Sequence, residues 1–482
     1  IYMGDWSSDV CSSDLPGAAV GIAINGKPVY RKGFGLANME QPIVLSPTIR
    51  MRIGSTTKHF TALTYMLLCE DGLATLDDPL GTHLPEVNPI AHGVTMRQLM
   101  GMTGGLRDAD DISYQFSGTG RGVPSADIVA LYRDIDDVNF KPGTAWTYNN
   151  GSYLALGVVI ERITDCPLED VMRERIFAPA GLHDTKLRRW DTDFFPNSAT
   201  LHMTNSSGGF EKSYLGHAGA GQGGIVSTIE DMLRWLAHMA APVVGTAATW
   251  DAIRTPHILS NGVSTGYGLG LMSGRYRGVE TLSHAGGVMG GNSQMLKVSA
   301  AGLDVVVMVN RHDVSGTLLT NQVLDACLPN LDPAERTEPA ALLEGTFRSA
   351  ATGRIIQFLA QGAQQVASID GFDVPVGRIG SKLLRPLAHL NYLKHEISLI
   401  GASAKPTSII FSDFGNVDEL VAMQAITNPD VGKIAGRYRS ETIETEAVIS
   451  GAGIDTRLST TGRFGSAVYR LDPIAEIGRA HV

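Results

Sequence analysis

The stretch that most constrains the fold is Ile53–Gly72, IGSTTKHFTALTYMLLCEDG, an apolar segment with helical periodicity. Its large apolar side chains recur on one helical face, at Phe60, Leu63 and Leu67. A glycine at its end is typical of a helix stop. Ser55 and Lys58 are three residues apart, so their side chains meet on the first turn. The sequence therefore predicts a buried helix that presents a hydroxyl and an amine together.

Such a pair supports nucleophilic chemistry only if the amine can accept the serine proton, which requires neutral Lys58. Lowering a lysine pKa from about 10.4 to near 7.5 is a change of ~3 units, or ~4 kcal/mol. A helix dipole supplies only ~0.3–1 kcal/mol, so burial and a second proton-sharing group must supply the rest. Backbone N–H groups at the helix start, including that of Ser55, would face a developing oxyanion. For the pair alone, an ordinary surface Ser/Lys pair at a helix start is the alternative.

Two further motifs bear on this choice. Tyr148-Asn149-Asn150 lies in FKPGTAWTYNNGSY, a loop that precedes a helix, and loops commonly present functional side chains. An Asx-rich turn with a packing tyrosine is its alternative interpretation. His284-Ala285-Gly286-Gly287 ends the strand-like ETLSHAGG, and its small residues would let a substrate backbone lie along the strand edge. The alternative there is a hydrogen-bonded histidine followed by a turn.

The motifs together, in this order and spacing, resemble the penicillin-recognising serine hydrolases, whose members include class C β-lactamases. MGMTGGLRD, GGIVSTIEDMLRW and GYGLGL also resemble that superfamily, so the resemblance covers Pro16–Asn330. FKPGTAWTYNNGSY, ERIFAPAGL and HAGG are most similar to its serine D-aminopeptidases, and LEGTFRS and VGKIAGRYRS resemble the starts of their two later domains. The resemblance implies an α/β fold: an antiparallel sheet covered by helices, followed by two small antiparallel β-barrels.

The resemblance also implies roles for the catalytic residues. Ser55 would attack a carbonyl to form an acyl-enzyme, while Lys58 and Tyr148 would share the proton transfer, with Tyr148 returning the proton to the leaving amine. The implied activity is release of N-terminal D-amino acids, of the D-Ala type, from peptides and amides. An esterase or β-lactamase-like hydrolase of the same superfamily is the alternative. A non-catalytic protein that binds peptidoglycan fragments or penicillin is a second one.

The implied substrate-binding residues are Asn150, His284, Gly286 and Gly287. Asn150 would orient the lysine and the substrate amide, and the N–H groups of Ser55 and Gly287 would form the oxyanion hole. His284 stands where most relatives carry a lysine, which weakens the fixed positive charge at the carboxylate-binding edge. This favours an aminopeptidase over a carboxypeptidase.

Strands at both ends of the first part of the chain, with helices between, favour one helix-covered sheet. We expect a hairpin around Asn25-Gly26 and late strands at Tyr267–Leu271, Glu280–Ser283, Gly291–Lys297 and Leu303–Asn310. Expected helices include Ser125–Ile135, Leu154–Thr164, Leu168–Phe177 and Ser315–Cys327, and one capped by Ser227 or Thr228.

The predicted domains are a catalytic domain at 16–330, a first β-barrel at 340–428 and a second β-barrel at 431–475. Pro329–Pro339 is a polar, proline-bearing linker. A short internal repeat supports two similar β units, since GTFRS at 345–349 matches GRYRS at 436–440.

Residues 1–15 and 476–482 are predicted to be translated sequencing adapter. DVCSSDL, at 9–15, and EIGRAHV, at the end of the chain, can be encoded by reverse-complementary DNA. We therefore expect the second barrel to be truncated. A loop that in the resembled family helps to confine the substrate's amino end would fall beyond Ala475.

Composition argues against several other functions. Excluding the suspected adapter residues leaves 45 acidic and 38 basic residues, a net charge of −7, and no basic cluster suggests nucleic acid. No apolar run reaches the ~18 residues of a membrane span, and the histidines form no HExxH motif. We predict a small peptide or amide substrate, no metal or other cofactor, no nucleic-acid or membrane partner, a homodimer, and a cytoplasmic location.

Overall fold

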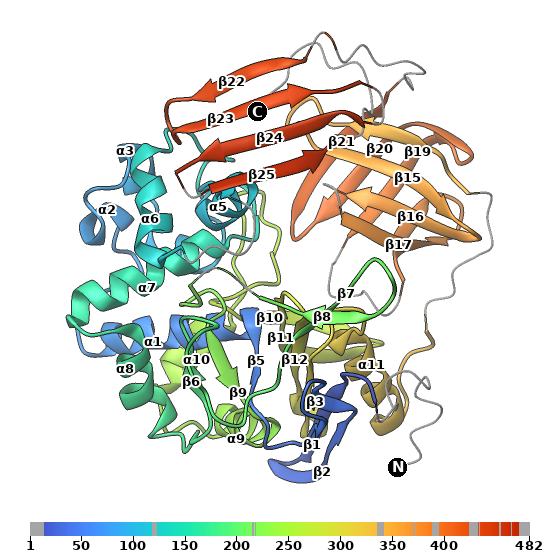
Figure 1. The fold of residues 1–482 in the computed structure, drawn as a ribbon. Coiled ribbons are helices and arrows are strands. Elements are labelled where there is room, and N and C mark those ends of the chain that lie inside the picture. The colour runs from blue at the N-terminus through green and yellow to red at the C-terminus, as the bar shows by residue number, and fades with distance from the viewer. Residues whose placement is uncertain are drawn as a thin grey trace. The chain divides into compact units, whose positions relative to one another are not determined.

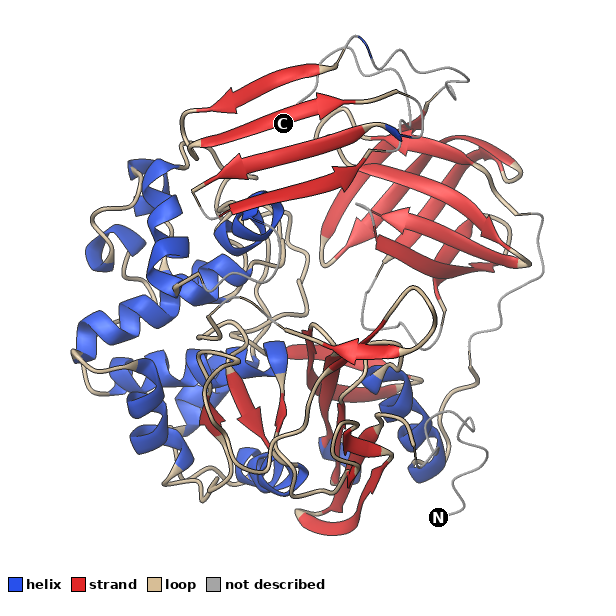
Figure 2. Cartoon of the chain, viewed as in Figure 1, coloured by secondary structure: helices blue, strands red, loops and turns tan. Residues whose placement is uncertain are grey.

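The computed structural model describes most of the chain (Figures 1 and 2). The described residues are 14–117, 123–214, 216, 218–334, 342–369, 372–387, 395–423, 432, 434–452, 455–463 and 465–471. Of the suspected adapter residues 1–15 and 476–482, residues 1–13 and 476–482 lie outside them. The described chain up to Asp332 forms one compact unit, the N-terminal unit, with the exception of residues 115–117. The described chain from Pro333 forms the C-terminal unit, and each unit is described by itself.

The N-terminal unit is built on a six-stranded antiparallel sheet in the order β10-β11-β12-β13-β1-β2. These strands are Met272–Tyr276, Val279–Val288, Gly291–Val298, Leu303–Val309, Ala18–Ile24 and Lys27–Phe34. The expected hairpin at Asn25-Gly26 joins β1 to β2, with both turn residues at positive φ. Strand β1 pairs along its whole length with β13, so the first and last strands of the unit lie side by side (Figure 1).

Two helices cover opposite faces of this sheet, as the strand periodicity requires. Val20 and Ile22 of β1 pack in one core with Leu319 and Val323 of α11 (Gly316–Cys327). Gly21 faces the other way, where an added Cβ would lie 2.4 Å from Ile229 of α9 (Ile229–Ala240). A glycine at this position therefore lets α9 pack closely on the sheet.

The remaining helices form a region around α1 (Lys58–Glu70), in which every residue from Lys58 to Leu68 is buried. They are α2 Leu80–His83, α3 Pro89–His92, α4 Met96–Met100, α5 Ala109–Ser117, α6 Ser125–Asp134, α7 Asn150–Thr164, α8 Leu168–Met172 and α10 Ala247–Arg254. The short strands are β3 Leu36–Asn38, β4 Ile43–Val44, β5 Met51–Arg52, β6 Lys186–Leu187, β7 His202–Thr204, β8 Phe210–Lys212 and β9 Ile225–Ser227. Helix α1 is thus a central core helix and not a surface helix with a single apolar face.

Three predicted elements differ in detail. Ser55 lies in η1, a 3₁₀ turn at Gly54–Thr57 that precedes α1, and not in the α-helix itself. The turn begins at Gly54, whose φ of +51° favours glycine. Helix α7 begins at Asn150 and not at Leu154, because the Asn149 side chain caps it by accepting from the N–H of Ser152. The strand predicted at 267–271 is wrong: the strand β10 begins at Met272, and Gly270 at φ +79° interrupts the extended backbone within the predicted segment.

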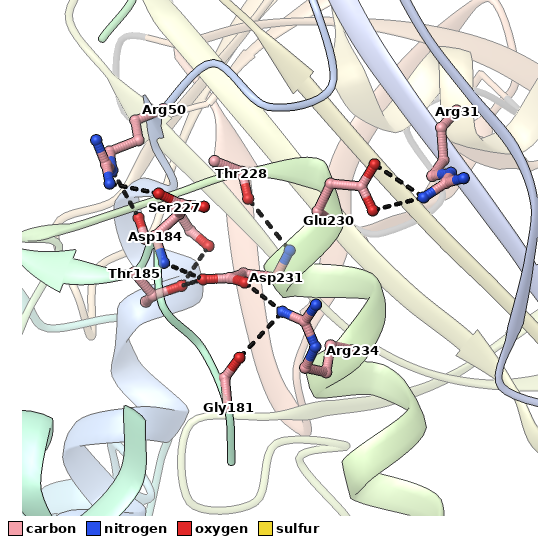
Figure 3. A network of polar contacts seen from close by, with 10 residues as sticks. All are labelled: Arg31, Arg50, Gly181, Asp184, Thr185, Ser227, Thr228, Glu230, Asp231 and Arg234. Carbon is pink, nitrogen blue, oxygen red and sulfur yellow. Dashed lines mark hydrogen bonds and ion pairs between the residues drawn. The ribbon is translucent and has the colours of Figure 1, made fainter. Parts of the chain in front are cut away.

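Helix α9 is fixed at its N-terminus by a polar network around the buried Asp231 (Figure 3). Thr228 is the N-cap, and its side chain accepts from the N–H of Asp231. The carboxylate of Asp231 accepts from the Asp184 N–H at 2.7 Å, from the Thr185 hydroxyl at 2.9 Å and from Arg234 at 2.5 Å. These contacts fix α9 to the segment that leads into β6.

The C-terminal unit contains a closed eight-stranded antiparallel barrel, which confirms the predicted fold class. Its strands are β14 Gly345–Arg348, β15 Ile355–Gln361, β16 Gln364–Ile369, β17 Phe372–Ile379, β18 Leu383–Pro386, β19 Glu396–Ala402, β20 Lys405–Asp413 and β21 Asn416–Ala422. Side chains such as Phe347, Phe358, Ile409 and Phe411 fill its interior.

The strands after the barrel are β22 Gly436–Ser440, β23 Thr445–Ser450, β24 Arg457–Gly462 and β25 Gly465–Arg470. In the described chain they form a four-stranded antiparallel sheet in sequence order. Both copies of the repeat start a strand, β14 and β22. The predicted division at 340–428 and 431–475 stays a prediction.

Candidate active site

The turn that carries Ser55 lies against the backbone of β11. An added Cβ on Gly54 would lie 2.8 Å from the Gly287 nitrogen, and one on Gly286 would lie 1.8 Å from the Ile53 carbonyl oxygen. Only glycines permit this approach. Ser55 is half-buried and Gly287 is exposed, so the two predicted oxyanion donors border one open surface.

The amine of Lys58 lies inside this turn, and its side chain is 0% exposed. Its Nζ is 3.0 Å from Ser55 Oγ, 2.7 Å from Asn150 Oδ1 and 2.7 Å from the Gln222 carbonyl oxygen. The two carbonyl groups can only accept, so they take two N–H bonds. A neutral amine then has its lone pair left for the third contact, where the Ser55 hydroxyl can donate.

The electrostatic setting favours that neutral form. Burial lowers the pKa of Lys58 to about 7, against the opposing effect of Asp108, Asp110 and Asp111. No carboxylate contacts the amine among the described hydrogen bonds and ion pairs. Burial therefore supplies the large pKa shift that the chemistry of the Ser/Lys pair requires.

Tyr148 lies over the same amine, with Lys58 Nζ 4.7 Å from its ring centroid. Burial raises the pKa of Tyr148, and a hydrogen bond with the side chain of Ser55 opposes the rise. The phenol is therefore protonated near pH 7 and can donate. The preceding Thr147 N–H bonds the Met102 carbonyl at 3.1 Å, which fixes the loop that carries the tyrosine.

Asn150 is positioned through its backbone. The Asp108 carboxylate accepts from the N–H groups of Asn150 at 2.6 Å and Gly151 at 2.9 Å, at the first turn of α7. The same carboxylate accepts from the N–H groups of Asp110 and Asp111 at the start of α5. One carboxylate thus joins two helix N-termini and directs the Asn150 amide toward Lys58.

His284 lies beside this cluster on β11, and its side chain is 3% exposed. Its Nδ1 is 2.5 Å from the Ala285 carbonyl, which can only accept, so Nδ1 carries the proton in the neutral ring. Nε2 then accepts from the Tyr267 hydroxyl at 3.0 Å. Burial and the neighbouring Lys58 lower the pKa of His284 to about 3, so the site has no cationic histidine at neutral pH.

The outer edge of β11 is available at the same place. Strand β10 pairs with β11 only over Val279–Ser283, so within the described chain no strand pairs with residues 284–288 on that side. The structure therefore gathers the predicted site residues Ser55, Lys58, Tyr148, Asn150, His284, Gly286 and Gly287 in the N-terminal unit, around η1 and this edge.

Three contributors escaped prediction, although they lie in or beside segments that the sequence analysis singled out. Gln222, just before GGIVSTIEDMLRW, contributes a backbone carbonyl, which has no side-chain signature. Asp108, in MGMTGGLRD, acts through backbone N–H groups 42 residues away. Tyr267, in GYGLGL, was placed in a strand and given no role.

The described residues contain no group of three or more His, Cys, Asp or Glu side chains arranged to hold a metal ion. Among the same residues, no helix combines the length and apolar character needed to cross a membrane.

Known proteins resemble this chain over most of its length. The chain matches the beta-lactamase family over residues 8–327. It is 26% identical over 449 residues to a D-aminopeptidase of Gluconobacter oxydans, an alignment that covers 91% of this chain and 82% of the relative.

Solved structures share the fold. An octameric penicillin-binding protein homologue from Pyrococcus abyssi superposes with a TM-score of 0.63 at 20% identity, over 84% of this chain and 96% of that one. A D-amino acid amidase from Ochrobactrum anthropi gives a TM-score of 0.55 at 23% identity, over 64% and 93%. The family match spans most of the chain, including every residue of the site, and the chain therefore belongs to the beta-lactamase family.

Proposed function

We propose that this protein is a serine hydrolase that works through an acyl-enzyme and releases N-terminal D-amino acids, of the D-Ala type, from small peptides and amides. The observation that carries the proposal is the fully buried Lys58 amine, which contacts two carbonyl acceptors and, at the third position, the Ser55 hydroxyl. The D-aminopeptidase relative aligned over 91% of the chain supports the substrate class.

In acylation, the Ser55 hydroxyl transfers its proton to neutral Lys58 as Oγ attacks the substrate carbonyl. The N–H groups of Ser55 and Gly287 stabilise the negative oxygen of the tetrahedral intermediate. Tyr148 donates its proton to the leaving amine and is reprotonated through Lys58. Water then hydrolyses the acyl-enzyme by the same route in reverse, which frees Ser55 and the D-amino acid.

Two features of the site favour an amino end over a carboxyl end. His284 is neutral and buried, so it offers no cation to a free carboxylate. Asp108, Asp110 and Asp111 act electrostatically on Lys58, which places negative charge near the reaction centre, where a substrate ammonium group gains from it. Desolvation and the two neighbouring carboxylates raise the pKa of Asp111 to about 7.

Activity against D-Ala p-nitroanilide, L-Ala p-nitroanilide, a p-nitrophenyl ester and nitrocefin tests the assignment. We expect D-Ala p-nitroanilide to have the highest kcat/KM, and Ser55→Ala to abolish turnover. Preference for the ester or nitrocefin would support the esterase or β-lactamase-like alternative. Binding of penicillin without turnover of any substrate would support the non-catalytic alternative. The predicted homodimer is tested separately by sedimentation.

A further inference from the structure

Two buried hydroxyl groups link the turn that carries Ser55 to the strand edge opposite it. Thr56 in η1 donates to the His284 carbonyl on β11 at 3.1 Å. Ser293 on β12 donates to the Ile53 carbonyl at 2.8 Å. The side chains are 1% and 4% exposed, and their oxygens are 3.3 Å apart. Each hydroxyl has one proton, so each proton is used on one carbonyl.

The two hydrogen bonds connect η1 and the residue before it to β11 and β12, and they donate in opposite directions. One extends from the nucleophile turn to β11, and the other from β12, which pairs with β11, back to the residue before Gly54. On the turn, Gly54 and Ser55 lie between the two bonded residues; on β11, Gly286 pairs with Ser293 and Gly287 follows it. Gly54 and Gly286 allow the two backbones to come into contact. In the described chain, no strand pairs with β11 beyond Ser283 on the edge that β10 occupies. Hydrogen bonds between paired strands therefore do not fix the distance between the η1 and β11 backbones.

We propose that Thr56 and Ser293 are positioning residues of the oxyanion hole. Together they set the separation between the N–H groups of Ser55 and Gly287. The inference rests on the proposed function, since it requires Ser55 to form a tetrahedral intermediate. Neither hydroxyl touches substrate; both act through the backbone that presents the two donors. Catalysis depends strongly on donors placed within hydrogen-bond distance of the developing oxyanion, so a small widening of the gap weakens transition-state binding more than substrate binding.

The variants Thr56→Val and Ser293→Ala remove one hydroxyl each with little change in volume. We expect kcat for D-Ala p-nitroanilide to fall about 10-fold or more in each, while KM changes less than about 2-fold. In the double variant, the fold-decrease in kcat should be much smaller than the product of the two single decreases. Either change alone already allows the distance between the Ser55 and Gly287 N–H groups to vary. Thr56→Ser keeps the hydroxyl and should restore at least half of the wild-type kcat.

A matched control is Thr64→Val, on α1, the helix that follows η1. Thr64 is fully buried, and its hydroxyl bonds the Phe60 carbonyl of its own helix at 2.8 Å, away from β11. Urea should unfold this variant about as easily as it unfolds Thr56→Val and Ser293→Ala, but kcat should stay at the wild-type value. Labelling with a fluorophosphonate counts the active sites in every sample, so each rate refers to folded protein.

A boronic acid analogue of D-Ala separates positioning from general loosening, because its tetrahedral adduct puts an oxygen in the hole. Its affinity should fall in proportion to kcat/KM, whereas the affinity of the product D-Ala should not change. If Thr56→Val and Ser293→Ala lower kcat no more than Thr64→Val does, or if Thr56→Ser gives no rescue, the positioning role is wrong. If Ser55→Ala stays active, the proposed function itself fails, which is a different result.

Discussion

Two buried lysines of the N-terminal unit have opposite surroundings. Lys58 is fully buried and bonds one hydroxyl and two carbonyl groups, with no carboxylate in contact. Lys297, on β12 and 7% exposed, forms an ion pair at 2.6 Å with Asp304, its cross-strand neighbour on β13, and donates to the Leu236 carbonyl of α9. The first environment favours an uncharged amine, and the second neutralises a charged one.

In the proposed function, the same residue type serves reactivity at Lys58 and structure at Lys297. With two N–H bonds to carbonyl groups and a lone pair toward a hydroxyl, Lys58 would act as a base. A direct carboxylate partner would keep an amine protonated and remove that capacity. The ion pair between Lys297 and Asp304 is itself incomplete, because Asp304 Oδ2 has no hydrogen-bond partner among the described residues and burial raises the pKa of this carboxyl.

Replacing Lys58 by methionine should have the largest effect on activity. We expect kcat/KM for D-Ala p-nitroanilide to fall about 10³-fold, because Ser55 loses its base. Burial lowers the folded-state pKa of Lys58 to about 7, below its value in the unfolded chain, so between pH 7 and 10 the unfolded chain binds more protons. Relative to Lys58→Met, the wild type should therefore gain stability as the pH rises through this window. Urea unfolding at pH 6, 8 and 9.5 measures this, and a constant difference would mean that Lys58 stays charged.

Replacing Lys297 by methionine should have the reverse pattern. Activity should stay within about 2-fold of wild type, while the free energy of unfolding falls by about 3 kcal/mol because a buried carboxylate loses its partner. The double variant Lys297→Met with Asp304→Leu should recover most of that loss, since no charge then remains buried. Urea unfolding of the three proteins at one pH is the measurement. If the double variant loses as much free energy of unfolding as Lys297→Met does, the broken ion pair is not the cause of the lower stability.

Replacing Asp111 by asparagine tests the acidic surroundings of Lys58. We expect KM for D-Ala p-nitroanilide to rise about 5-fold at pH 8, where Asp111 is charged, and KM for a p-nitrophenyl ester without an amine to stay constant. Because Asp111 raises the pKa of Lys58, the acidic limb of the kcat/KM profile should also move to lower pH. Asp127→Asn, at an exposed acid on α6, is the control. If KM rises equally for the ester and for the anilide, Asp111 does not take part in recognising the substrate amine.

Replacing Tyr267 by phenylalanine should have the smallest effect. It leaves the buried His284 Nε2 without its donor, which costs about 1–2 kcal/mol of stability. We expect kcat to fall about 3-fold, because only the bond from Nδ1–H to the Ala285 carbonyl then holds the imidazole and its tautomer beside Lys58. The ¹⁵N chemical shifts of His284 report the tautomer directly. Unchanged shifts would mean that Ala285 alone fixes the ring.

The residues proposed to carry the chemistry could be singled out from the sequence because each lies in a compact local pattern. Ser55 and Lys58 share one helical turn, and His284 is followed at once by small residues. The strand pattern also placed β12, β13 and the first part of β11; β13 is a short apolar run that is buried along its whole length.

The supporting contacts could not be found this way. The carbonyl of Gln222 and the N–H groups capped by Asp108 are backbone atoms that any residue has, and their partners are far away in the chain. The 3₁₀ turn at Ser55 and the positive φ of Gly54 occur where this segment meets the backbone of Gly287. Such features depend on which segments meet, which periodicity does not reveal.

The most direct test of the account is the pH dependence of Ser55 labelling by an uncharged fluorophosphonate. This reagent has no titrating amine, so the rate reports the base that serves Ser55. We expect the second-order rate constant to rise with a single apparent pKa near 7, and the rise to disappear in Lys58→Met, together with most of the rate. A rate that is flat between pH 6 and 9, or one that keeps the same pKa in Lys58→Met, would contradict the claim that a neutral buried amine activates this serine.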